Sequence, residues 1–298
     1  MAYPIIPAAY GLKTVSLAGG RVYSGSTRLI PIASNYGYNL FDGDVVTASG
    51  GSLVVTTLGA ASSPVAGTIG VFVGAQYVNS MSQTVRAQFY AANTITNTLY
   101  GPNSLQGYVV DDPYAVFQAA VLTQSTSVSN TPGATIGYVN PSFIGSNMYL
   151  VTNGSNGGSA SGNTTTGDSA MGLTGGVVTS GTQGNTRVTS SAPFRVVNVV
   201  PDTAVTVTAV GSTSGSSSTL TLTAANTAIS PGMQLIIPGV TGALASNFLT
   251  VTNVSSTTVT LSASITVASG TALSFIGYPE VQVQWNFGYH GYLNATAA

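Results

Sequence analysis

The stretch TIGVFVGAQYV, residues 68–78, decides the fold class. It is rich in Val, Ile, Phe and Tyr and lacks the 3.6-residue spacing of charged side chains that marks an amphipathic helix. Similar runs, bounded by Gly, Asn, Ser and Pro, recur at TRLIPIA (27–33), GDVVT (43–47), SLVVTTL (52–58), LQGYVVD (105–111), YAVFQAAVL (114–122), FRVVNVV (194–200) and EVQVQWNF (280–287). The sequence therefore predicts an all-β protein whose main domain, residues 13–202 plus 278–298, is a β-sandwich or barrel-like.

Residues 203–277 form a second unit with a different texture. All charged side chains lie outside it, and its strand-like runs recur at roughly 12-residue spacing, which suits a small sandwich or barrel. The runs are VTVTAV (205–210), TLTLT (219–223), MQLII (233–237), FLTVTNV (248–254), TVTLS (258–262) and LSFI (273–276). The fifth of these follows the fourth through a predicted hairpin turn at Asn-Val-Ser-Ser. If the flanking runs FRVVNVV and EVQVQWNF are sheet neighbours, the module is an insertion between them.

Two further segments differ from the strand pattern. Residues 1–12 are apolar and contain Pro4 and Pro7, which exclude a regular helix and favour an extended arm. Such an arm is either a frayed terminus or an element that docks on a neighbouring molecule. Residues 151–186 form a Gly/Ser/Thr/Asn-rich tract, which predicts a long surface loop in which DSAMGL forms a brief ordered turn.

Composition excludes several function classes. Charged residues are 4% of the chain, against about 25% in an ordinary domain, and the net charge is −1. Six dispersed cations do not provide a nucleic-acid footprint. The absence of cysteine removes disulfides and thiolate metal sites, and a single histidine does not build a zinc site. The sequence predicts no metal, no cofactor, no transmembrane helix and no signal peptide.

Two carboxylate pairs are candidates for chemistry. Asp111 and Asp112 lie in YVVDDPYAVFQ (108–118), between two predicted strands and before a proline. Asp and Pro are typical turn residues, and adjacent strand residues point to opposite faces, so a turn is favoured over an acid–base pair. Asp42 and Asp44 in FDGDVV also indicate a turn, with a partial cation site as the alternative, since a calcium loop needs more oxygen ligands.

The aromatic residues and the single histidine favour structural roles. His290 accompanies no nucleophile motif, so a structural or interface role is expected for it. Trp285 and the tyrosines are dispersed in the sequence without an accompanying amide or acidic cluster, which favours core and interface packing over sugar stacking. The chain is therefore not expected to be an enzyme.

The order of several short blocks resembles the capsid cement (head decoration) proteins of short-tailed marine bacteriophages. The resemblance covers about residues 10–200 and 278–291. It is carried by Tyr10-Gly11-Leu12, Gly19-Gly20, Thr27-Arg28-Leu29-Ile30-Pro31-Ile32-Ala33-Ser34, FDGDVV, IGVFVGAQYV, YVVDDPYAVFQ, RVVNVVPD and YPEVQVQWNFGYH. Members of that family pass from the Val-Pro-Asp segment to the closing strand through a short loop. This chain departs from them by carrying the 203–277 module, whose hairpins look like the immunoglobulin-like additions of phage surface proteins.

The resemblance implies a virion protein made in a bacterial cytoplasm and bound to the outer face of the major capsid protein lattice. This agrees with the composition, from which no enzymatic activity and no nucleic-acid or membrane partner are expected. Self-association is expected, and a trimer is one candidate form because the lattice has threefold axes. Arginine is enriched at interfaces, and the apolar arm offers burial that salt barely screens. The expected capsid-binding residues are Tyr3, Pro4, Ile5, Ile6, Pro7, Tyr10, Arg21, Arg28 and Arg86.

Two alternatives remain open at this stage. One is a phage adhesin or a fibre or knob subunit, with weak glycan contacts through residues 203–277. A fibre usually shows repeats along the whole chain, whereas repeat-like texture is confined here to that module. The other is a carbohydrate-active enzyme, which would need a carboxylate pair in a cleft.

Overall fold

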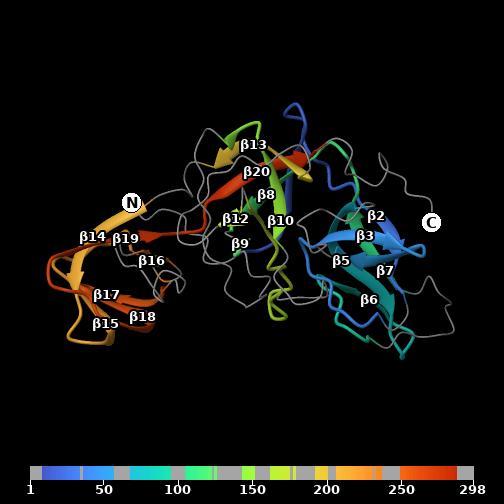
Figure 1. The fold of residues 1–298 in the computed structure, drawn as a ribbon. Coiled ribbons are helices and arrows are strands. Elements are labelled where there is room, and N and C mark those ends of the chain that lie inside the picture. Colours follow the sequence, from blue (N-terminus) through green and yellow to red (C-terminus); the bar gives the residue numbers. More distant parts are fainter. Residues whose placement is uncertain are drawn as a thin grey trace.

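The computed structural model is all-β, as the strand pattern predicts. It describes residues 9–33, 36–56, 68–94, 105–122, 124–125, 143–151, 162–174, 177–178, 192–200, 206–229, 231, 233–236 and 249–286. Within these residues the elements are strands, turns and bridges, and none of them is a helix long and apolar enough to cross a membrane. The described strands form two six-stranded sheets, one two-stranded sheet and a closed barrel. Figure 1 shows the barrel apart from the sheets.

Sheet A contains six antiparallel strands in the order β1-β8-β20-β13-β10-β11. Its strands are β1 (Lys13–Leu17), β8 (Ala115–Ala120), β20 (Glu280–Trp285), β13 (Phe194–Val200), β10 (Asn147–Val151) and β11 (Gly172–Thr174). Sequence neighbours are thus rarely sheet neighbours, and the central strand β20 comes from the last part of the chain.

Sheet B also contains six strands, in the order β2-β7-β5-β3-β4, with β6 paired to β5 beside this path. They are β2 (Arg28–Pro31), β7 (Leu105–Val110), β5 (Thr68–Val78), β3 (Val45–Ser49), β4 (Ser52–Val55) and β6 (Thr84–Ala87). The first half of β5 pairs with β3 and the second half with β6, which explains its length. A small parallel pair joins β9 (Gln124–Ser125) to β12 (Val177–Val178).

Sheets A and B share one hydrophobic core. Trp285 of sheet A is only 4% exposed and packs against two phenylalanines, with ring centroids 5.6 Å from Phe117 and 4.7 Å from Phe194. On sheet B, Gly107 leaves room for larger neighbours, because a Cβ there would lie 2.6 Å from Cδ1 of Leu53. The main domain is therefore a two-sheet sandwich, and Trp285 has the core role that its sequence context favours.

The module forms a closed barrel of six antiparallel strands, in the order β14-β15-β18-β17-β16-β19. They are β14 (Thr206–Ser212), β15 (Ser217–Leu222), β16 (Gln234–Ile236), β17 (Leu249–Ser255), β18 (Thr258–Ile265) and β19 (Thr271–Ile276). The run β14-β15-β18-β17 has the A-B-E-D order of an immunoglobulin sheet, and β16-β19 has the C-F order of the facing sheet. Pairing of β16 with β17 and of β14 with β19 closes these two sheets into a barrel.

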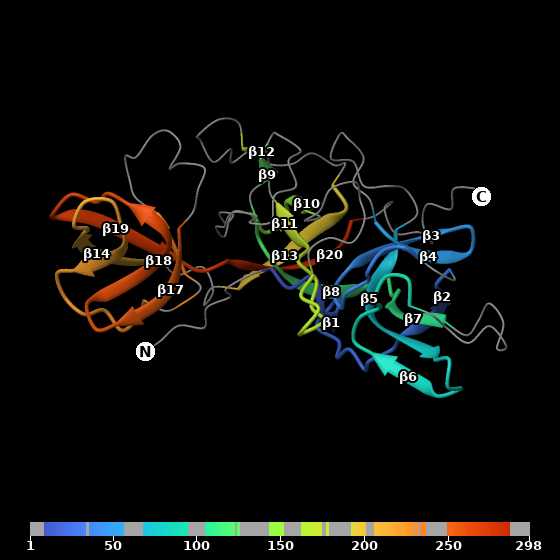
Figure 2. The same cartoon turned by 90° about the horizontal axis from the view of Figure 1, so that it is seen from below.

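The barrel is inserted between two neighbouring strands of sheet A. Val200 at the end of β13 pairs with Glu280 at the start of β20, so the chain leaves and re-enters the sheet at adjacent positions. This confirms that the flanking runs are sheet neighbours. Both views place the barrel beside the sheets at one end of the molecule (Figures 1 and 2).

Several sequence-based boundaries need correction. The last residues of the predicted arm 1–12 belong to the body, since Leu12 is fully buried and its N–H donates to the carbonyl of Gly43 at 3.0 Å; residues 1–8 lie outside the described residues. Within the predicted loop 151–186 the structure confirms the turn at DSAMGL, where the N–H of Met171 donates to Oγ of Ser169 at 2.9 Å, but it also contains strands β11 and β12. The sequence did not predict strands β1, β6, β9, β10, β11 and β12. The β17–β18 turn falls at Ser256–Thr257, slightly later than Asn-Val-Ser-Ser.

Candidate functional site

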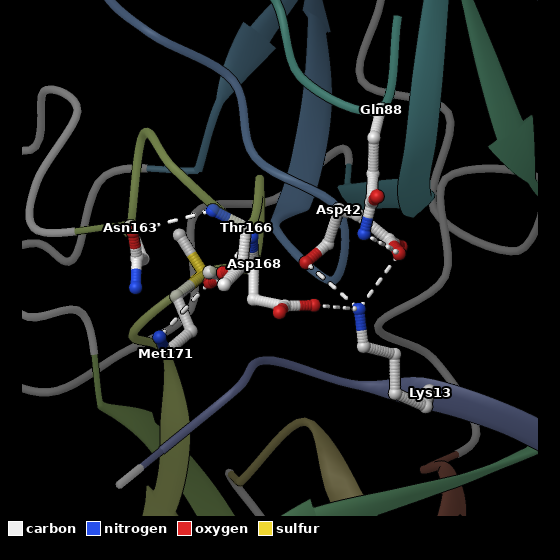
Figure 3. Close-up of polar contacts among 8 residues, drawn as sticks. Lys13, Asp42, Gln88, Asn163, Thr166, Asp168 and Met171 are labelled. Atoms are coloured by element: carbon white, nitrogen blue, oxygen red, sulfur yellow. Dashed lines mark hydrogen bonds and ion pairs between the residues drawn. The ribbon is translucent and has the colours of Figure 1, made fainter.

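The chain's sole lysine binds two carboxylates from distant segments (Figure 3). Nζ of Lys13 lies 2.7 Å from Oδ2 of Asp42 and 2.9 Å from Oδ1 of Asp168. The amide of Gln88 also donates to Oδ2 of Asp42 at 3.3 Å. We call these four residues, Lys13, Asp42, Asp168 and Gln88, the Lys13 cluster. It connects sheet A to the segment before β3 and to the segment before β11.

Backbone contacts position both aspartates of the Lys13 cluster. The N–H of Asp42 donates to the carbonyl of Gly167 at 2.9 Å, and the N–H of Ser169 donates to the carbonyl of Asp42 at 2.9 Å. Asn163 orders the beginning of the segment that contains Asp168, because Oδ1 of Asn163 accepts the N–H of Thr165 at 2.8 Å. This packing explains why part of the Gly/Ser/Thr tract is an ordered segment.

Asp44 lies beside the cluster but is buried. Its Oδ2 accepts the N–H of Phe41 at 2.8 Å, and its N–H donates to the carbonyl of Phe41, which confirms the turn predicted for FDGDVV. Burial raises the pKa of Asp44 to about 6, against the lowering effect of the hydrogen bonds from Phe41 and Ser169. Among the residues that the structure describes, no three His, Cys, Asp or Glu side chains are grouped to hold a metal ion.

The Asp-Asp-Pro stretch is a turn between β7 and β8. Oδ1 of Asp112 accepts the N–H of Tyr114 at 2.8 Å, and its carbonyl accepts the N–H of Ala115 at 3.1 Å. Asp111 pairs with Arg28 on β2, with 3.4 Å between Oδ2 and Nη1. The two carboxylates therefore have separate structural partners, as the turn interpretation expects.

Exposed apolar and charged side chains gather around this turn. Val22 is 86% exposed and Tyr114 is 52% exposed. The N–H of Ala18 donates to the carbonyl of Tyr114 at 2.7 Å, and the N–H of Leu17 donates to the carbonyl of Arg21 at 2.8 Å. These contacts bring together a surface that we call the distal patch, consisting of Arg21, Val22, Arg28, Asp111 and Tyr114.

The distal patch and the barrel lie at opposite ends of the strands of sheet A. Ala115, at the start of β8, pairs with Leu17, next to the patch. Ala120, at the end of β8, pairs with Glu280, where the chain returns from the barrel. Five strand steps of about 3.3 Å separate these positions, or roughly 17 Å.

The structure does not bring all the predicted capsid-binding arginines together. Arg21 and Arg28 lie in the distal patch. Across the strands of sheet B, Arg86 on β6 is the register partner of Gln76 on β5, and Gln76 is the partner of Gln106 on β7. Arg28 on β2 is instead the partner of Val109 on β7. Residues 106 and 109 of β7 point to opposite faces, so Arg86 lies on the other face of sheet B from Arg28. Nε of Arg86 donates to Oε1 of Gln76 at 3.1 Å.

Tyr10 lies at the barrel end of sheet A, away from the distal patch. Its hydroxyl donates to Oε1 of Glu280 in a short hydrogen bond, and the amide of Gln118 donates to Oε2 at 3.1 Å. Burial, followed by the contact with Glu280, raises the pKa of Tyr10 well above its usual range. Its ring packs on a small cluster that includes Ala120, Leu122 and Tyr278. Tyr10 therefore contacts its own chain.

Some predicted residues lie outside the described part of the chain, namely Tyr3, Pro4, Ile5, Ile6, Pro7 and His290. Conversely, the sequence did not indicate two sets of polar contacts between distant segments, namely the Lys13 cluster and the hydrogen bonds of the buried Glu280. One signal was available for the first of them, because Lys13 is the only lysine in 298 residues.

Comparison with known proteins adds no identification. No family model, no curated protein and no solved structure matches this chain.

Proposed function

We propose that this protein is a structural protein of a bacteriophage virion, which decorates the head by binding the outer surface of the major capsid protein lattice. The observation that carries the proposal is the two-ended arrangement of sheet A. A surface of Val, Tyr and Arg lies at one end, and a separate, uncharged barrel is attached at the other. One end of such a molecule can bind a lattice while the barrel projects from it.

The composition of the distal patch supports a protein partner. Aromatic side chains and arginine are enriched in protein interfaces, whereas Val22 at 86% exposure has no role in a core. The 4% content of charged residues also suits binding by apolar burial, which salt screens little. The resemblance to cement proteins points to the same partner.

The N-terminal residues are the second candidate for the lattice contact. Since Tyr10, Gly11 and Leu12 pack into the body, a deletion of residues 1–12 would disturb the fold. Deletion of residues 1–8 tests the arm alone.

The test is co-sedimentation with phage heads stripped of this protein, at low and at seawater salt. Wild type should bind saturably at both salts. The double variant Val22→Ser/Tyr114→Ser should bind at least tenfold more weakly, whereas Met81→Ser, which changes a 78% exposed side chain between β5 and β6, should bind normally. Absence of wild-type binding at either salt would contradict the proposal.

The alternative function is an adhesin or a fibre or knob subunit. The threonine-rich outer surface of the barrel favours it, since Thr219 pairs with Thr260 and Thr221 with Thr258 across neighbouring strands. Binding of the free protein to host cells, lost on removal of residues 203–277 and combined with no binding to heads, would support this alternative.

A further inference from the structure

A cluster of tyrosines presents one ring to solvent on a segment that precedes β3. Tyr36 and Tyr38 make an edge-to-face contact with ring centroids 5.6 Å apart, and Tyr36 lies 6.3 Å from Tyr90. Tyr90 is fully buried, as expected of a core tyrosine, whereas Tyr38 is 47% exposed. The sequence shows these residues as dispersed, but the fold brings them together.

Hydrogen bonds hold this segment in place from several sides. Leu40 and Tyr90 exchange backbone hydrogen bonds of 3.0 and 2.8 Å. The N–H of Ala92 donates to Oδ1 of Asn39 at 2.7 Å, and the hydroxyl of Tyr36 accepts the N–H of Val55 at 2.9 Å. A ligand at Tyr38 would therefore meet a surface that needs little ordering on binding.

An exposed amide lies close to Gly37, the residue before Tyr38. Asn93 is exposed and has a positive φ of 57°, and its N–H donates to the carbonyl of Tyr36 at 2.9 Å. Its Oδ1 would lie 3.9 Å from a Cβ placed on Gly37. A side chain on Gly37 would come into van der Waals contact with this amide, so the glycine keeps the amide uncovered on that side. Neither 36–40 nor 89–94 contains a charged residue.

We propose that Tyr38 and Asn93 form a binding site for a neutral saccharide. The face of a pyranose ring is apolar and stacks on an aromatic ring, while an amide offers both a donor and an acceptor to neighbouring sugar hydroxyls. Gly37 and Asn39, which flank Tyr38, add no apolar side chain to the apolar area that a protein interface of about 800 Å² on each side would use. This inference is independent of capsid binding.

The site makes few contacts, so the dissociation constant should be about 1 mM or weaker. Saturation-transfer NMR detects binding in this range. The probes are maltohexaose, cellohexaose and laminarihexaose, with an alginate hexamer as the charged comparison. Wild type should give transfer signals with at least one neutral hexamer. The signal should fall at least tenfold in Tyr38→Ala and severalfold in Asn93→Gly, which keeps the positive φ accessible and removes only the amide.

Tyr114→Ala is the matched control, because Tyr114 is similarly exposed at 52% but belongs to the distal patch. It should keep the saccharide signal, and Tyr38→Ala should bind heads normally. Fluorescence of the buried Trp285 checks that each variant is folded. The inference is overturned if wild type binds no neutral hexamer or if Tyr38→Ala binds as wild type does. Loss of saccharide binding only on removal of residues 203–277 would assign it to the barrel and would also overturn the inference.

Discussion

Nζ of Lys13 lies 2.7 Å from Oδ2 of Asp42, and this contact joins the edge strand of sheet A to the segment that leads into sheet B. With Asp168 as the second carboxylate, one cation holds three chain segments together. The side chains are 30%, 18% and 35% exposed, so the ion pairs are partly screened by solvent.

Replacing Lys13 by Met should lower the free energy of unfolding by about 1–2 kcal/mol, because each partly exposed ion pair contributes about 0.2–1 kcal/mol and two carboxylates are left side by side. Urea denaturation followed by Trp285 fluorescence measures this change. Arg21→Met is the control, since Arg21 is exposed and its Nε donates to the carbonyl of Ala18 at 3.3 Å, three residues away in the chain. Equal stability of both variants would show that the Lys13 cluster does not support the fold.

The buried carboxyl of Asp44 should make stability depend on pH. Its pKa is raised to about 6 by burial, from an ordinary value near 4, so the folded state binds this proton more tightly than the unfolded state does. The protonated Asp44 carboxyl therefore contributes fully to the free energy of unfolding below about pH 4, and this contribution is lost as pH rises through about 6. It amounts to roughly 2–3 kcal/mol. Denaturation at pH 4, 5, 6 and 7 measures the slope.

Asp44→Asn should remove this slope, because the amide oxygen still accepts from Phe41 but does not titrate. Asp112→Asn, in the β7–β8 turn, should keep it. Asp168 affects stability at lower pH than Asp44 does. Burial raises the pKa of Asp168, but the hydrogen bonds from Lys13 and Thr166 outweigh this effect, so the pKa is lowered. Its stabilisation is thus lost only as pH falls below about 4. A slope between pH 4 and 6 that persists in Asp44→Asn would rule out Asp44 as its source.

The strands could be predicted where local sequence decides them. Residues 68–78 and 194–200 were predicted with the bounds that β5 and β13 have, because β-branched and aromatic runs end there at turn residues. Strand β11, GLT within a Gly-rich tract, has no such local signal. Gly172 is needed there because a Cβ would lie 2.6 Å from Cδ1 of Leu122, which is a requirement set by packing.

The sites depended on contacts that a sequence pattern does not contain. Lys13 and Asp168 are 155 residues apart, and Tyr10 and Glu280 are 270 apart. The Asp-Asp-Pro turn was predictable because Asp112 bonds to the backbone two residues later. The gathering of Tyr36, Tyr38 and Asn93 was not, because it depends on the pairing of Leu40 with Tyr90.

Two glycines should be required where segments 10–13 and 41–45 cross. Gly43 has φ +97°, and a Cβ there would lie 2.9 Å from Cα of Gly11 and from the nitrogen of Leu12. Gly43→Ala should therefore lower stability by about 2–4 kcal/mol, combining backbone strain with a backbone clash. Gly51→Ala is the matched control, since φ is +80° but nothing lies within 4 Å, so about 1 kcal/mol is expected. Similar losses in both variants would show that only the positive φ matters.

The barrel should be removable without unfolding the sandwich. Val200 and Glu280 are paired, so a short loop can join β13 to β20. Tyr278 and Pro279 must remain, because Tyr278 belongs to the cluster under Tyr10 and the carbonyl of Pro279 accepts the N–H of Val121 at 2.8 Å. The variant therefore replaces residues 203–277 by one glycine.

We expect this variant to keep the blue-shifted fluorescence of Trp285 and a single unfolding transition, because the barrel core is a cluster separate from the core of the two sheets. Residues 203–277 expressed alone should unfold cooperatively by circular dichroism, since each of the six described strands of the closed barrel is paired on both sides. If Trp285 becomes exposed after excision while the isolated barrel still folds, sheet A depends on the barrel to hold β13 against β20. If instead the isolated barrel is unfolded, its closure requires the sandwich to fix the separation of its two chain ends.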